Sequence, residues 1–184
     1  MLHPIAPITG RRIRIALVGC GRISANHIRA IAAHHERAEL TAICDTQPER
    51  LQQAQQHIRE AAQEHPGAAS SPAAFSTYTE LLNAAQAGNT PVDLVVLATP
   101  SGLHSGQVIA AAEAGLHVCT EKPMATRWAD GVAMVKACDD AGVHLFVVKQ
   151  NRFNSTLQLV KRQLGAGRFG RLAMVAVNVF WQRP

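Results

Sequence analysis

The sequence predicts an α/β fold in which a parallel sheet is covered by helices on both faces. Two observations predict it. Short, mostly apolar runs alternate with longer segments of helical periodicity, and runs of this kind are typical of parallel strands buried on both sides. Because strand–helix alternation builds right-handed βαβ units, we expect a doubly wound sheet. The expected strands are 13–18, 40–44, 94–98, 117–119 and 143–148.

The segments between these strands carry helix and turn signals. A loop rich in Pro, Gly and Ser over 65–74 precedes a short expected strand at 75–77. Thr126 is the expected N-cap of a later helix, and Gly142 is expected to follow its last turn. The expected helices, in chain order, are 48–63, 79–87, 126–141 and 155–164.

The pattern changes after Gln150. Three glycines, at 165, 167 and 170, interrupt the chain after the last expected helix. Apolar residues then alternate with period two over 171–181, which is typical of an antiparallel strand with one covered face. We therefore expect two domains. The first, 1–150, binds a nucleotide, and 151–184 begins a truncated second α/β domain with an antiparallel sheet.

The segment VGCGRIS at 18–24 leaves the first strand and opens a helix. Gly19 permits the tight turn, and Gly21 lets the backbone approach a pyrophosphate that the helix N-terminus then binds. Ser24 replaces the third glycine of the usual pattern and is small enough for close helix–strand packing. A tight turn without a ligand is the alternative. The order of strand, turn and helix favours a Rossmann-type dinucleotide site.

Asp45 ends the second strand, where an acidic residue hydrogen-bonds the adenosine ribose. Its carboxylate would repel a 2′-phosphate, which favours NAD over NADP; a simple turn aspartate is the alternative. Three further loops follow parallel strands at the edge where ligands bind: ATPSGLH at 98–104, TEKP at 120–123 and KQNRFN at 149–154.

Two of these loops carry candidate substrate residues. Pro123 favours an extended Lys122, which would hydrogen-bond a substrate hydroxyl and favour its deprotonation. Asn151 and Arg152 would hold a sugar hydroxyl, a carboxylate or a phosphate. The alternatives are a solvated lysine for the first loop and, for the second, a turn with a helix cap at Asn154.

The composition restricts the function class. The chain is 47% apolar, has no apolar run long enough to span a membrane, and shows no secretion signal over 1–10. Four cysteines without CxxC spacing favour free thiols in the cytoplasm. The net charge of +5 is dispersed and only 4% of residues are aromatic, so we expect an anionic small ligand and no nucleic-acid partner. The nine histidines show no metal-binding spacing, so we expect no metal.

Together the motifs VGCGRIS, Asp45, ATPSGLH, AGLHVCTEKPMA and KQNRF resemble the Gfo/Idh/MocA oxidoreductase family, in the family's order over 13–154. The resemblance implies an N-terminal Rossmann domain, a C-terminal α/β domain with an open antiparallel sheet, and NAD(P)-dependent chemistry at a sugar or polyol carbon. It also implies a set of cofactor-binding residues: Gly19, Gly21, Arg22, Ile23, Asp45, Thr99, Pro100, His104, Glu121 and Lys122.

The stretch from Val147 to Pro184 is similar to dehydrogenases that act on UDP-N-acetylglucosaminuronate in bacterial O-antigen biosynthesis. This likeness implies oxidation of the sugar C3 hydroxyl, with hydride passing to NAD+. Lys122 would assist the C3 hydroxyl as the catalytic lysine, and Asn151 and Arg152 would face the sugar-nucleotide substrate. Such enzymes are tetramers assembled through their open sheets, so a homo-oligomer is implied for the full-length form.

The family's catalytic histidine follows an aspartate in a helix of the second domain, beyond the 184 residues. We therefore expect the N-terminal part of such a dehydrogenase, which binds NAD without turnover of its own. Two alternatives stay open. One is a non-catalytic NAD-binding module or remnant, and the other is a dehydrogenase for another sugar or polyol.

Overall fold

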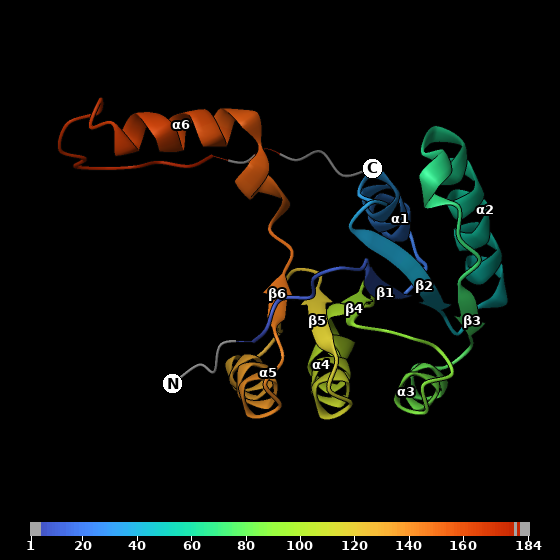
Figure 1. Cartoon of the computed structure of the whole chain (residues 1–184). Helices are drawn as coiled ribbons and strands as arrows, with labels where there is room; N and C mark the ends of the chain where they lie inside the picture. Colours follow the sequence, from blue (N-terminus) through green and yellow to red (C-terminus); the bar gives the residue numbers. More distant parts are fainter. Residues whose placement is uncertain (1–4, 179, 181–184) are drawn as a thin grey trace. The chain divides into compact units, whose positions relative to one another are not determined.

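The computed structural model describes residues 5–178 and 180 (Figure 1). The chain divides into two compact units, Met1–Val148 and Lys149–Pro184. The first unit contains every strand of the described chain, and the second contains a single α-helix.

The first unit is built on a six-stranded parallel sheet with the order β3-β2-β1-β4-β5-β6. This confirms the doubly wound α/β prediction. The order reverses between β1 and β4, and the carboxyl ends of strands at such a switch point are where open α/β sheets bind ligands. The strands are β1 Ile13–Val18, β2 Ala38–Cys44, β3 Ala73–Phe75, β4 Leu94–Leu97, β5 His117–Thr120 and β6 Leu145–Val147.

Helices cover both faces of this sheet (Figure 1). On one face lie α1 Ser24–Ala33 and α2 Pro48–Glu64, and on the other lie α3 Tyr78–Gln86, α4 His104–Glu113 and α5 Trp128–Asp140. Short 3-10 turns occur at Pro66–Ala68 and Ser101–Leu103. Among the described residues, no helix is both long and apolar enough to cross a bilayer.

The sequence of the central strand β1 is almost continuously apolar because both of its faces are covered. Ile15 and Leu17 belong to the apolar cluster beneath α1 and α2, whereas Ala16 and Val18 belong to the cluster beneath α3, α4 and α5. Successive side chains of a strand point to opposite faces, so a strand with two covered faces needs apolar residues at every position. Leu17 and Ala16 are completely buried.

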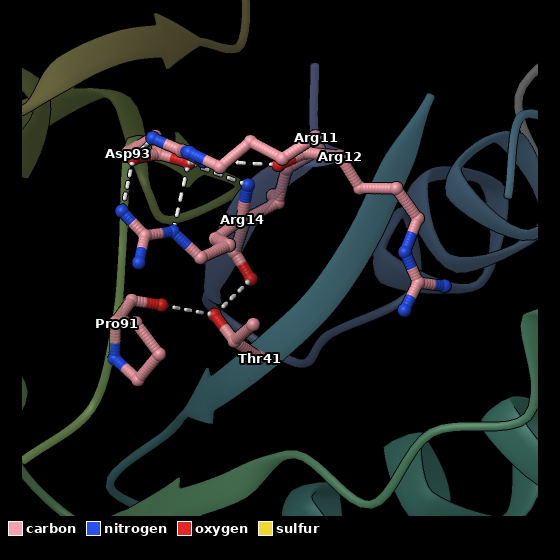
Figure 2. A network of polar contacts seen from close by, with 7 residues as sticks. Arg11, Arg12, Arg14, Thr41, Pro91 and Asp93 are labelled. Carbon is pink, nitrogen blue, oxygen red and sulfur yellow. Dashed lines mark hydrogen bonds and ion pairs between the residues drawn. The ribbon is translucent and has the colours of Figure 1, made fainter. Parts of the chain in front are cut away.

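Asp93, which directly precedes β4, joins the amino ends of β1 and β4 (Figure 2). Its carboxylate accepts two hydrogen bonds from the Arg11 guanidinium, at 2.6 and 2.9 Å. It also accepts the backbone N–H of Arg14 at 2.8 Å and two bonds from the Arg14 side chain, at 3.0 and 2.7 Å. Burial raises the pKa of Asp93, but the hydrogen bonds from Arg14 and Arg11 outweigh burial and hold this pKa well below its usual range.

Several expected boundaries in the first unit differ from the structure, among them the ends of β2 and β6, and two of the differences have a clear cause. The helix expected to begin after Thr126 starts at Trp128, with Arg127 at the N-cap position making no side-chain capping hydrogen bond. Met124 and Ala125 pack against the apolar cluster instead, which keeps this stretch outside the helix. The strand expected at 75–77 ends at Phe75, because the Thr77 side chain accepts the N–H of Glu80 in a capping box that starts α3.

The second unit contains a 3-10 turn, Gln150–Phe153, and the helix α6, Ser155–Gly165. Asn154 caps α6, since its side chain accepts the N–H of Thr156 at 3.0 Å. The strand expected over 171–181 is wrong for 171–178, which have no strand structure; residues 179 and 181 lie outside the described residues. A strand needs a hydrogen-bonded neighbour, and the described part of this unit offers no second strand.

Candidate functional site

Four loops of the first unit leave the carboxyl ends of β1, β2, β4 and β5 near the switch point. They contain the glycine-rich segment, Asp45, Thr99 and Glu121, in that order. The cofactor candidates predicted from the sequence lie on these four loops, apart from His104, which is the first residue of α4. The geometry of each loop decides what its residues are able to contact.

Gly19 sits where no other residue fits. Its φ is +90°, in the region that favours glycine. A Cβ at this position would lie 2.7 Å from the carbonyl oxygen of Ala98, and the Gly19 N–H donates to the carbonyl of Cys44 at 2.8 Å. The glycine-rich loop therefore crosses directly over the end of β4.

Gly21 has open space beside it, in contrast to Gly19. An added Cβ would meet only the tip of the Arg50 side chain, at 3.8 Å. Ser24 is buried, and its hydroxyl donates a hydrogen bond to the carbonyl of Gly21 at 2.6 Å. This hydrogen bond stabilises the turn between β1 and α1. Arg22 and Ile23 are exposed at the tip of the loop.

The start of α1 fits a pyrophosphate. Ile23, at the N-cap position, makes no side-chain capping bond, and the first turn contains no acidic residue. Helix N-termini bind anions through free N–H groups and the positive end of the helix dipole. The open space beside Gly21 lets a phosphate approach the positive end of this dipole, where the N–H groups of Ser24 and Asn26 already donate to the carbonyls of Gly21 and Ile23. The residues present therefore suit the diphosphate of a dinucleotide.

Asp45 shapes the glycine-rich loop from the end of β2. It is 8% exposed; its Oδ2 accepts the N–H of Cys20 at 2.8 Å, and its Oδ1 accepts the N–H of Gln47 at 2.9 Å. Arg50 lies 3.9 Å from Oδ2. A carboxylate oxygen accepts more than one hydrogen bond, so these contacts leave acceptor capacity for a ribose hydroxyl.

The cysteines near this loop are buried thiols. Burial raises the pKa of both Cys20 and Cys44 to about 12. Such thiols remain protonated and unreactive near neutral pH. All four cysteines, Cys119 and Cys138 included, are free in the structure.

His104 connects the loops that follow β4 and β5. The side chain is almost completely buried, with Nδ1 lying 3.0 Å from the Pro123 carbonyl oxygen and Nε2 lying 3.0 Å from that of Thr99. Both ring nitrogens therefore lie within hydrogen-bond distance of carbonyl oxygens of the chain itself, and the cofactor contact expected of His104 stays a prediction. The Thr99 hydroxyl donates to the Gln107 side chain at 2.6 Å, and Pro100 is exposed.

Lys122 is exposed in the loop after β5, and its peptide bond to Pro123 is cis. The preceding Glu121 donates its N–H to the carbonyl of Leu97 at 3.0 Å, which ties this loop to the end of β4. One carboxylate oxygen of Glu121 lies 3.0 Å from Nε2 of His27, in α1. The structure therefore brings Glu121 and the helix after the glycine-rich loop into contact.

Asn151 and Arg152 belong to the second unit. Both lie in the 3-10 turn before α6 and are exposed. The cofactor candidates all belong to the first unit, so the two candidate groups occupy different units of the chain.

Sequence reasoning missed three side chains at this edge: His27, Arg50 and Gln107. Each contacts a candidate residue from a helix, but only the contact of His27 with Glu121 spans a long sequence separation, of 94 residues. The nearness of His27 to the glycine-rich motif, of Arg50 to Asp45 and of Gln107 to Thr99 could have suggested that these side chains face the same edge.

Comparison with known proteins agrees with this geometry. The family described as "Oxidoreductase family, NAD-binding Rossmann fold" matches residues 13–149. The D-apiose dehydrogenase of Paraburkholderia graminis is 35% identical over 95% of this chain and 40% of its own length. The chain thus spans less than half the length of this curated relative.

Two solved structures are more similar. The WlbA dehydrogenase from Bordetella pertussis, in complex with NADH and UDP-GlcNAcA, is 57% identical with a TM-score of 0.78, over 95% of this chain and 48% of that one. The WlbA dehydrogenase from Chromobacterium violaceum, with the same two ligands, is 51% identical with a TM-score of 0.81, over 98% and 48%.

The family match extends over most of the first unit and ends at its boundary with the second. The family description specifies an NAD-binding Rossmann fold, which agrees with a helix N-terminus beside Gly21 and a carboxylate at the end of β2. The chain belongs to the Gfo/Idh/MocA family of NAD-binding oxidoreductases.

Proposed function

We propose that this chain is the cofactor-binding half of an NAD-dependent dehydrogenase that oxidises the C3 hydroxyl of a UDP-N-acetylhexosaminuronate. One observation carries the proposal: the identities of 57% and 51% with two dehydrogenases whose structures contain NADH and UDP-GlcNAcA. The similarity covers 95% of the chain or more, which is beyond what the first unit alone supplies.

In this reaction NAD+ would accept the hydride. The chain binds and orients it: the glycine-rich loop and the start of α1 hold the pyrophosphate, and Asp45 holds the adenosine ribose. Oxidation to the ketone removes a hydride from C3 and a proton from the hydroxyl oxygen. Lys122 hydrogen-bonds that oxygen and stabilises the negative charge that develops as the proton leaves.

The remaining parts of the proposal follow from the family resemblance. Asn151 and Arg152 hold the anionic groups of the sugar nucleotide, since a guanidinium pairs well with carboxylates and phosphates. The histidine expected in a second domain accepts the proton. The full-length protein is a homotetramer assembled through open sheets.

The test is NADH formation from NAD+ and UDP-N-acetylglucosaminuronate. We expect the 184-residue chain to bind NAD without turnover, and a version extended by any coding sequence that follows Pro184 to produce NADH. UDP-N-acetylglucosamine is the matched control, because it lacks only the carboxylate and should react poorly. Binding of NAD with no turnover by the extended version would instead indicate a non-catalytic NAD-binding module.

A second candidate is a dehydrogenase for another sugar or polyol. The 35% identity with a D-apiose dehydrogenase favours it, although the coverage of that relative is only 40%. D-apiose and myo-inositol therefore belong in the same assay. Turnover of a free sugar in preference to the sugar nucleotide would replace the first proposal with this one.

A further inference from the structure

His27 and Glu121 form a contact that joins two loops of the cofactor edge. His27 lies near the start of α1, and Glu121 follows β5, 94 residues later in the chain. Nε2 of His27 lies 3.0 Å from Oε1 of Glu121, and the two side chains are only 17% and 13% exposed. Because water is largely excluded, this contact is stronger than an exposed pair of the same groups.

The second oxygen of the Glu121 carboxylate accepts a hydrogen bond from the next residue in the chain. Oε2 accepts the backbone N–H of Lys122 at 3.2 Å, while the N–H of Glu121 itself donates to the carbonyl of Leu97 at 3.0 Å. The turn that carries Lys122 is therefore held both by the end of β4 and by the Glu121 carboxylate. The orientation of that carboxylate in turn depends on His27.

The helix that carries His27 also begins at the glycine-rich loop. Ser24, the first residue of α1, bonds to Gly21 and lies less than one helical turn before His27. We propose that His27 is a positioning residue, which acts through Glu121 to hold the Lys122 turn in register with the glycine-rich loop. This inference rests on the proposed function, because it takes Glu121 and Lys122 as groups at the nicotinamide end of the cofactor.

A second histidine–glutamate pair provides a matched comparison. Nδ1 of His57 lies 3.3 Å from Oε2 of Glu60, three residues further along α2, and these side chains are 39% and 53% exposed. The pair is local to one helix and joins no two loops. Its removal deletes the same chemical groups without disturbing the cofactor edge.

The experiment is calorimetric titration of the 184-residue chain with NADH and with ADP, which keeps the adenosine and diphosphate but lacks the nicotinamide riboside. For His27→Ala we expect the NADH affinity to fall about tenfold, the value of one shielded hydrogen bond to a charged group. The ADP affinity should remain that of the unsubstituted chain. His27→Gln keeps a side-chain donor and should restore most of the NADH affinity, and His57→Ala should change neither affinity.

Two results would overturn the inference: unchanged NADH affinity in His27→Ala, or an equal loss for NADH and ADP, which would indicate a general disturbance of the fold. Glu121→Ala removes the contacts to both His27 and the Lys122 N–H, so it should weaken NADH binding at least as much as His27→Ala does. The double variant should lose no more than Glu121→Ala alone, since His27 acts only through Glu121. Additive losses would contradict it. If the unsubstituted chain binds neither ligand, the proposed function itself fails.

Discussion

The two units of the chain contain similar helices in opposite surroundings. In the first, each helix places its apolar face against the sheet, and Leu17, Ile43 and Leu81 are completely buried. In the second, α6 is also amphipathic, yet it has no buried residue, and Leu157 and Val160 are 50% and 42% exposed. Helical periodicity therefore specifies the helix in both units, but burial requires a neighbouring element, which the first unit supplies and the described residues of the second do not.

This difference divides the proposed chemistry between the units. The residues expected to hold NAD, together with Lys122, lie in a unit with its own core. The substrate candidates Asn151 and Arg152 lie in a unit without buried side chains in its helix. Substitutions in the first unit should therefore act on the cofactor, the chemistry or the stability, and substitutions in the second should act on substrate affinity or self-association.

The largest expected effect concerns Lys122. In a version of the chain that turns over its substrate, Lys122→Ala should lower kcat by about 100- to 10,000-fold, the usual range for lost acid–base assistance. NAD affinity should fall far less than kcat, because the amine acts mainly on the substrate oxygen in the transition state. Arg152→Ala, in the second unit, should instead raise KM about tenfold through loss of a charge-assisted hydrogen bond. Steady-state kinetics separates the two, with the exposed Arg162→Ala in α6 as control; near-normal kcat in Lys122→Ala would refute the role.

Next in size is the loss of cofactor binding in Gly21→Val. The added side chain occupies the open space that a pyrophosphate needs, so calorimetry should detect no NAD binding while the thermal unfolding midpoint is retained. Gly19→Ala should behave differently. Its Cβ would clash with the Ala98 carbonyl at a φ of +90°, which should cost about 1 to 3 kcal/mol of unfolding free energy. Retained NAD affinity in Gly21→Val would contradict the phosphate-loop assignment.

A smaller effect is expected at the opposite edge of the sheet. Asp93→Ala removes the carboxylate that binds the partly exposed Arg14 and Arg11 guanidinium groups, and should lower the unfolding free energy by about 1 to 2 kcal/mol. The exposed Asp140, paired with Lys136, is the matched control, and Asp140→Ala should cost less than about 1 kcal/mol. Urea unfolding measures both.

The Asp93 effect should also depend on pH. The pKa of Asp93 is lowered in the folded chain, so its stabilisation is fully present above the unfolded value of about 4 and is lost as the pH falls toward the folded value. The difference in unfolding free energy between the unsubstituted chain and Asp93→Ala should therefore shrink below about pH 4. A difference that grows in acid would show that the sign of the pKa shift is wrong.

The smallest stability effect is expected from removal of the second unit. A chain of residues 1–148 should unfold within about 0.5 kcal/mol of the 184-residue chain, because α6 buries no residue. Its association should change more. Exposed apolar residues on α6 and over 172–177 should make the longer chain self-associate, whereas the shorter one should elute as a monomer in size-exclusion chromatography. A monomeric longer chain would contradict this expectation.

The sheet was predictable because strands with two covered faces require continuous apolar runs. The range expected for β1 is the observed one, and the others differ at their ends, except that β3 was expected at 75–77 and is observed at Ala73–Phe75. The start of α5 was missed because capping at Thr126 competes with packing by Met124 and Ala125, and only the second depends on tertiary structure. The prediction of a strand over 171–181 was wrong for a different reason. A period-two pattern indicates which side chains share one face of a strand, but it does not indicate which second strand would pair with it.

The site divides in the same way. The glycines and Asp45 could be proposed from local order, since a strand, a turn and a helix follow one another in the sequence. The contact of His27 with Glu121 and the double engagement of His104 could not, because they join loops distant in sequence. His104 would be part of the same sequence motif whether its side chain contacts a ligand or holds a loop in position. The structure adds that this side chain is buried, which the motif alone does not show.

The bond from the Cys20 N–H to Asp45 has a consequence for the timing of cofactor exchange. This bond, together with the Ser24 hydroxyl on Gly21, holds the glycine-rich loop in shape through contacts that the chain itself supplies. A ligand that meets a preorganised loop loses little conformational entropy there, and its capture does not wait for the loop to order. Variants of this loop should then differ mainly in their dissociation rates, so that the residence time of the dinucleotide sets how long the chain stays loaded.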